Sequence, residues 1–125
     1  MNGPKNVIRG FSVAILVIVS MGVARAENRP ETIKGYVLDS ACAFTKNLKK
    51  PISAECAVAC AKAGSPLVIL TDSGTIYWPI SDATPAQGQN DRLLEFAGKR
   101  VVVTGKVYQR TGSRAVVIAT IQAEK

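Results

Sequence analysis

Apolar and polar side chains alternate over residues 32–39, TIKGYVLD, with Ile33 and Val37 on one face. A period of two residues is typical of a β-strand that buries one face. Gly35 inside this strand indicates a bulge or a tight bend. The pattern predicts a first strand that is followed by a basic loop over residues 43–51.

The pattern changes to that of a helix farther along the chain. Residues 54–63 are rich in alanine, Ser53 stands at the N-cap position, and Gly64 stands where a glycine commonly ends a helix. Pro66 prevents continuation. We therefore expect one helix, and it carries two of the three cysteines.

Two hairpins are predicted after the helix. The apolar runs LVIL and TIYWPI flank residues 72–74, Asp-Ser-Gly, which form a short turn. Residues 81–91 are polar and without periodicity, so they form a loop. Asp91 is expected to cap a short helical turn that Gly98 ends.

The last third of the chain predicts the second hairpin. Its sequence is KRVVVTGKVYQRTGSRAVVIATIQ, with the turn at residues 111–113. A strict period of two groups the side chains of each strand on one face: Val101, Val103, Gly105 and Val107 on the first, and Ala115, Val117, Ala119 and Ile121 on the second.

This order of elements predicts a mainly β protein with one cysteine-bearing helix. Five short strands with internal glycines favour a small five-stranded OB-like barrel over residues 32–123, because closure hides the sheet edges. The alternative is an open α+β sheet with the helix on one face.

The N-terminus has the pattern of a secretory signal peptide. Lys5 and Arg9 precede an apolar run over residues 11–24, and small residues stand at the two positions read before a cut after Ala26. The run is shorter than the roughly 20 residues that span a bilayer. We therefore expect residues 1–26 to be removed and the protein to be periplasmic or secreted. The alternative is an uncleaved membrane anchor.

Cleavage changes the charge of the protein. Residues 27–31 would remain as a polar lead-in, and the loss of three basic side chains would lower the net charge from +7 to +4. This is an ordinary solubility charge. It does not favour nucleic acid as a partner, and membrane contact is expected only through an uncleaved signal segment. The expected partner is an unidentified ligand or another envelope component.

Cys42, Cys56 and Cys60 are the only cysteines. We favour a disulfide from Cys42 to Cys56 or to Cys60, with Cys60 preferred because the helical wheel turns it inward. A direct bond between Cys56 and Cys60 would be strained, because residues four apart on a helix have Cβ atoms about 5–6 Å apart. Three alternatives stay open: a thiolate metal site, for example for zinc, with Asp39 as fourth ligand; a redox-active thiol pair; and buried reduced cysteines.

The chain contains no histidine. This excludes Ser-His and Cys-His nucleophilic pairs and the usual zinc hydrolase ligands, and no phosphate-binding fingerprint is present. We therefore expect no enzyme activity and no cofactor besides the alternative thiolate-bound metal. Tyr36, Tyr77 and Trp78 are candidates for a ligand surface on the barrel. The sequence predicts an exported, non-catalytic envelope protein that acts as a binding or structural module; the alternative is a metal-binding or thiol-redox protein.

Four segments carry a resemblance: KGYVLDSACA, ECAVACAKAGSPLVIL, GTIYWPI and FAGKRVVVTGKV. Over residues 33–121 they resemble small exported bacterial proteins of unknown function that share an Asp-Ser-x-Cys … Cys-x3-Cys pattern. The matching positions are Asp39, Ser40, Cys42, Cys56, Cys60, Gly64, Gly98, Val101, Val103 and Gly105. The resemblance implies a compact OB-like barrel and no established activity. Members often have a histidine between the first two cysteines, and this chain has none there.

Overall fold

The computed structural model describes residues 2–4, 10, 30–46 and 52–125. Most of the predicted signal peptide, part of the polar lead-in and residues 47–51 of the predicted basic loop lie outside the described residues. Within the described ranges, no helix has the length and apolar character needed to cross a membrane.

Five strands close into a barrel in the order β1-β2-β3-β5-β4. They are β1 (Glu31–Asp39), β2 (Leu67–Leu70), β3 (Ile76–Pro79), β4 (Arg100–Arg110) and β5 (Ser113–Ala123). All neighbouring strands are antiparallel except β3 and β5, which are parallel. The structure confirms a mainly β protein with a small five-stranded barrel, and the closed sheet excludes the open alternative.

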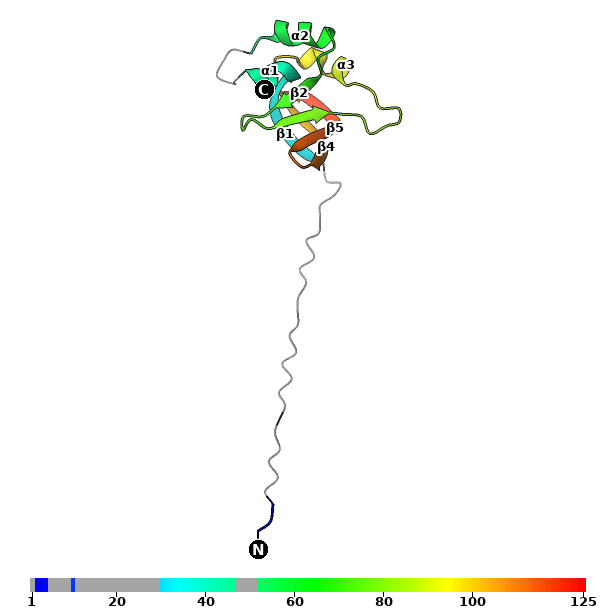
Figure 1. Ribbon diagram of the computed structural model, residues 1–125. Helices are drawn as coiled ribbons and strands as arrows, with labels where there is room; N and C mark the ends of the chain where they lie inside the picture. The colour runs from blue at the N-terminus through cyan, green and yellow to red at the C-terminus, as the bar shows by residue number, and fades with distance from the viewer. Residues whose placement is uncertain (1, 5–9, 11–29, 47–51) are drawn as a thin grey trace.

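Three short helices gather at one end of the barrel (Figure 1). They are α1 (Ser40–Thr45), α2 (Ala54–Lys62) and α3 (Asn90–Leu93), and a 3-10 turn, η1 (Leu94–Phe96), continues α3. The connection from β1 to β2 contains α1 and α2, and the connection from β3 to β4 contains α3. The Asn90 side chain joins the two connections: it accepts from Leu67 N (2.8 Å) and donates to Ser65 O (2.8 Å).

The barrel interior is filled by side chains that alternate along the strands, as the period of two predicts. They include Ile33 and Val37 of β1, and Leu93 enters from α3. Val101, Val103 and Gly105 of β4 share a buried face, as predicted. The register between β4 and β5 shifts between Thr104 and Gly105, and this bulge breaks the alternation that we predicted for β5. Ile121 therefore packs on the core with Val116 and Ile118 and does not share a face with Ala115, Val117 and Ala119.

A second apolar cluster lies on the outer side of β1, β2 and β3. This outer cluster consists of Leu38, Ala43, Val68 and Leu70, with Tyr36, Ile52, Ile76 and Trp78 packed against it. All four residues of β2 are buried, which explains its uninterrupted apolar sequence. Ala43 comes from α1, so this helix covers part of the outer sheet face.

Two local predictions are wrong. The basic loop was expected to begin at residue 43, but α1 extends to Thr45 because the Asp39 side chain caps it, accepting from Cys42 N at 3.2 Å. Asp91 lies within α3, whose N-cap is Gln89 and has no side-chain cap bond. The helix predicted at residues 54–63 is confirmed as α2, with Ser53 as its N-cap.

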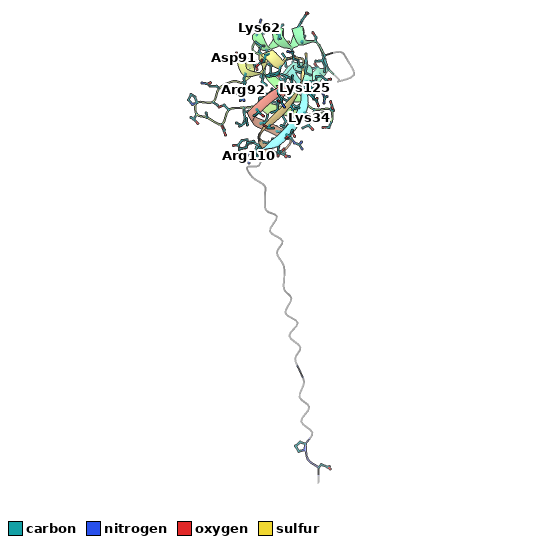
Figure 2. The ribbon with its side chains drawn as sticks, turned by 180° about the vertical axis from the view of Figure 1, so that it is seen from behind. Lys34, Lys62, Asp91, Arg92, Arg110 and Lys125 are labelled. Atoms are coloured by element: carbon teal, nitrogen blue, oxygen red, sulfur yellow. The ribbon has the colours of Figure 1, made fainter. Side chains whose placement is uncertain are left out.

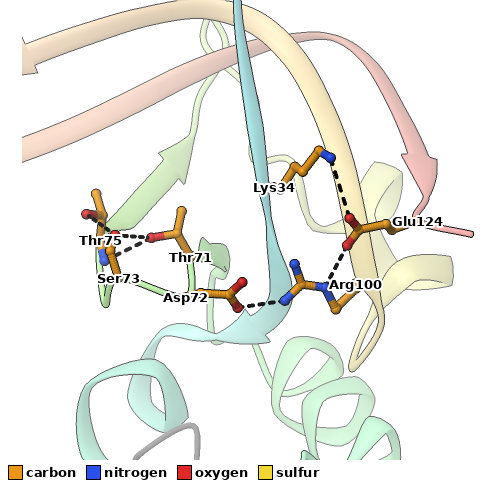
Figure 3. Close-up of polar contacts among 7 residues, drawn as sticks. All are labelled: Lys34, Thr71, Asp72, Ser73, Thr75, Arg100 and Glu124. Atoms are coloured by element: carbon orange, nitrogen blue, oxygen red, sulfur yellow. Dashed lines mark hydrogen bonds and ion pairs between the residues drawn. The ribbon is translucent and has the colours of Figure 1, made fainter.

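Arg100 joins three parts of the barrel (Figure 3). Its guanidinium contacts Asp72 Oδ1 at 2.6 Å and Glu124 Oε2 at 2.6 Å, and Lys34 lies 3.7 Å from Glu124. Arg100 also stacks over the ring of Tyr36, 5.1 Å from its centroid. The contacts tie the β2–β3 turn and the end of the chain to β4.

Loss of the Arg100 ion pairs should make stability less dependent on pH. Hydrogen bonds from Arg100 lower the pKa of Asp72 and of Glu124. The two ion pairs therefore stabilise the folded protein fully at pH values above the ordinary carboxyl pKa, about 4. This stabilisation is lost as the pH falls through the lowered pKa values. Arg100→Met should lower the Tm at neutral pH, and the difference from the native protein should narrow in acid. Thermal unfolding at a series of pH values measures this; a difference that stays constant down to about pH 2 would contradict it.

Candidate functional site

A cleft of about 480 Å³ opens beside β3. The β2–β3 turn, the β4–β5 turn and α1 surround it. Its lining residues are Phe44, Gly74, Thr75, Ile76, Trp78, Gly112, Ser113 and Arg114. We call this the aromatic cleft, because two aromatic side chains lie on its wall.

Phe44 and Trp78 form an aromatic pair in this cleft. Their ring centroids are 6.4 Å apart, and the planes are inclined by 39°. Phe44 is 68% exposed. Trp78 packs partly against the outer cluster, whereas Phe44 projects from α1 with little cover. The pair therefore presents ring surface to a ligand.

The polar part of the cleft comes from the two turns and from β5. Thr71, Ser73 and Thr75 are joined by hydroxyl hydrogen bonds of 2.9 and 3.2 Å across the β2–β3 turn (Figure 3). These bonds hold the rim of the cleft in place. Arg114 lies over the ring of Tyr77, 6.0 Å from its centroid, and supplies a positive charge at the other rim.

The structure separates the three aromatic residues that we proposed as a ligand surface. Tyr36 and Trp78 pack on the outer cluster, but Tyr77 packs against the barrel interior. Trp78 lines the aromatic cleft, and Tyr36 instead lies under Arg100. Phe44 was not among the predicted ligand-surface residues, because α1 was not predicted.

A second cleft, of about 510 Å³, lies between the end of α2 and α3. It is slightly larger, but its wall contains no aromatic ring and no basic side chain. The lining residues are Gly64, Pro66, Leu67, Pro79, Gln87, Gly88, Gln89, Asn90 and Asp91. The side chains that line the aromatic cleft are therefore better suited to ligand binding than those that line this second cleft.

Asp39 is a fully buried carboxylate at the end of β1. Its Oδ2 accepts from Cys42 N and from Ser65 Oγ, the latter at 3.4 Å. Its Oδ1 is also buried and has no hydrogen-bond partner in the described part of the chain. A buried carboxylate needs donors that compensate for its burial, and the Cys42 N–H, the Ser65 hydroxyl and the Cys42 thiol supply them.

The structure brings the three cysteines together next to Asp39. A hydrogen bond with the Asp39 carboxylate, followed by burial, raises the pKa of Cys42 to about 11, and Cys56 adds a smaller effect. The pKa of Cys60 is also raised, first by burial and then by Asp39 and Cys56. Cys56 thus raises the pKa of both other thiols. We call these four residues the Asp39–cysteine cluster.

The predicted disulfide is not formed: all three cysteines are free thiols and half-buried. Ala57 and Ala61 form the buried face of α2, and the two half-buried helical cysteines lie beside it. In the described residues, no three carboxylate or thiol side chains already have the arrangement of a metal site.

Figure 2 labels charged side chains at both ends of the barrel, from Lys62 at the helical end to Arg110 at the opposite end.

Comparison of the chain with protein-family models, with curated proteins and with solved structures gave no significant match.

Proposed function

We propose that the protein is an exported, non-catalytic module of the cell envelope that binds an oligosaccharide in the aromatic cleft. The exposed Phe44 beside Trp78 is the observation that carries the proposal. OB-like barrels commonly bind oligonucleotides or oligosaccharides at strands 2 and 3 and at the neighbouring loops. The aromatic cleft is lined by β3, by the β2–β3 and β4–β5 turns and by α1 in the β1–β2 connection, so it lies near that part of the barrel.

The lining residues favour a sugar chain. The Phe44 and Trp78 rings offer apolar surface for the C–H face of a sugar, and Thr75 and Ser113 offer hydroxyl groups to its polar edge. Arg114 adds a charged donor that suits a carboxylate on an acidic sugar. The signal-peptide pattern at residues 1–26 supports a location where envelope glycans are found.

An oligonucleotide would stack its bases on the same kind of aromatic surface, but it would also need basic side chains that neutralise its phosphates. After cleavage the chain carries a net charge of only +4, because three of its basic residues belong to the signal segment. A sugar chain therefore fits the site better.

Phe44→Ala should raise the Kd for an acidic oligosaccharide at least about tenfold, equal to about 1.4 kcal/mol, because it removes half of the aromatic platform. Stability should change by less than about 1 kcal/mol, because the side chain is mostly exposed. Trp78 is the only tryptophan, so its fluorescence reports occupancy of the cleft. Titrations would use a uronic-acid oligosaccharide, its neutral counterpart and an oligothymidylate.

Ile80→Ala is a matched control, since Ile80 is also an exposed apolar residue but does not line the cleft. Its Kd should equal that of the native protein. Arg114→Gln should weaken binding of the acidic sugar more than binding of the neutral one. Preferential binding of the oligothymidylate, or equal sugar affinities for Phe44→Ala and the native protein, would refute the proposal.

A further inference from the structure

We infer that the oligosaccharide site continues from the aromatic cleft across β5 to Tyr108 of β4, which gives an acidic sugar chain a second aromatic contact. The inference rests on the proposed function and extends it, because it specifies the length and the charge of the ligand. It uses three residues on neighbouring strands, Trp78, Ala115 and Tyr108, which we call the outer row.

The strand register places the outer row in one line across the barrel. Trp78 of β3 pairs with Ala115 of β5, and Ala115 pairs in turn with Tyr108 of β4. Two strand spacings, about 10 Å in all, therefore separate Trp78 from Tyr108. A sugar chain that fills the cleft at Trp78 would meet Tyr108 only if it extends beyond the cleft.

The outer row faces away from the barrel interior. The residues that adjoin it in sequence pack in the interior: Tyr77, Val107 and Val116. Successive side chains on a strand point to opposite faces, so the three residues of the row point outward. Each of them is partly exposed, and Trp78 also lines the cleft. The row is therefore a continuation of the cleft wall on the outer surface of the sheet.

The small side chain of Ala115 leaves the path between the two aromatic residues open. A single methyl group stands between Trp78 and Tyr108, so a ligand chain can cross β5 from one ring to the other. Ser113 lies two residues before Ala115 on the same face and lines the cleft. Its hydroxyl group can bind a sugar hydroxyl at the start of this path.

Two basic residues flank Tyr108 on the same face of β4. They are Lys106 and Arg110, two residues before and after it. Lys106 Nζ lies 4.8 Å from the centroid of the Tyr108 ring, and Arg110 pairs with Ser113 at the edge of the cleft. Contact with Tyr108, and more weakly the charge of Asp82, raise the pKa of Lys106, so this side chain stays charged. Carboxylates along an acidic sugar chain would bind these cations, whereas a neutral chain would not.

The test compares a uronic-acid disaccharide with a hexasaccharide of the same repeating unit, by calorimetry on the full chain. The disaccharide should occupy the aromatic cleft alone, whereas the hexasaccharide should also reach Tyr108. We therefore expect the Kd of the hexasaccharide to be at least about tenfold lower. A neutral hexasaccharide should gain less over its own disaccharide, because it makes no ion pairs with Lys106 and Arg110.

Tyr108→Ala should raise the Kd of the acidic hexasaccharide about fivefold or more and leave that of the disaccharide unchanged. Tyr108→Phe keeps the ring and should bind both sugars like the native protein. Ala115→Glu places bulk and a negative charge in the path, so it should also weaken only the hexasaccharide. Gln122→Ala is the matched control, because Gln122 is exposed on β5 and lies outside the row. It should bind both sugars like the native protein.

The outcomes separate this inference from the proposed function. If Phe44→Ala weakens disaccharide binding but the native protein binds both sugar lengths equally, the cleft stands and the inference is overturned. A native Kd of Tyr108→Ala for the hexasaccharide would overturn it as well, as would equal weakening of both sugars by Tyr108→Ala and by Ala115→Glu. Failure of the native protein to bind either sugar would overturn the proposed function and this extension together.

Discussion

Gly98→Ala should destabilise the protein by about 3 kcal/mol, a large part of the stability of a marginally stable domain. Gly98 has φ +77°, a conformation that disfavours a side chain. A Cβ atom at this position would also lie 2.5 Å from Ala54 Cα and 2.9 Å from Ala54 N. Both are backbone atoms of α2, so the overlap cannot be relieved by rotating a side chain.

The position of Gly98 explains why its neighbours cannot move away. Its N–H donates to Val37 O at 2.7 Å, so the residue is fixed between β1 and the first turn of α2. Urea unfolding of the native and variant proteins measures the loss. Gly112→Ala is the matched control, because a Cβ there would meet no atom within 4 Å. Equal unfolding midpoints for the Gly98 and Gly112 variants would contradict this account of the packing.

Leu93→Ala should cost about 2–5 kcal/mol, because it leaves a cavity in the barrel interior. Leu93 is 0% exposed and is the residue through which α3 joins the inner cluster. The free energy of unfolding should fall while the slope of its dependence on urea stays the same, since the barrel still unfolds as one unit.

Phe44→Ala provides the comparison for Leu93→Ala. It deletes a larger side chain, but Phe44 is mostly exposed, so its loss should cost less than about 1 kcal/mol. Comparing the stability losses of the two variants shows whether the loss follows the burial of the side chain or its size. A Phe44 variant that loses as much stability as the Leu93 variant would show that α1 belongs to the core.

The sequence predicted the barrel well where local signals and burial agree. The alternation in β1 and the Ser53 cap of α2 appear in the structure at the predicted positions. The bulge at Thr104 and Gly105 was not predictable in the same way, because a bulge depends on how two strands pair. A strict period of two therefore placed Ile121 on the same face as Ala115, Val117 and Ala119, whereas it packs on the core with Val116 and Ile118.

The candidate sites were harder to predict for two physical reasons. With only six residues, α1 is too short to show a helical period, and only its cap at Asp39 gave a local signal. Phe44 lies on α1, so it was not predicted as a site residue either. On α2, small alanines rather than the cysteines face the barrel, which permits the close approach of Ala54 to Gly98.

The proposed binding site can be tested most directly by mapping amide chemical shifts of the nitrogen-15-labelled protein during titration with a uronic-acid disaccharide. We expect shift changes only at residues that line the aromatic cleft: Phe44, the β2–β3 turn, Trp78 and residues 112–114. Changes confined to the second cleft near Gly64 and Asp91, or no changes at all, would contradict it.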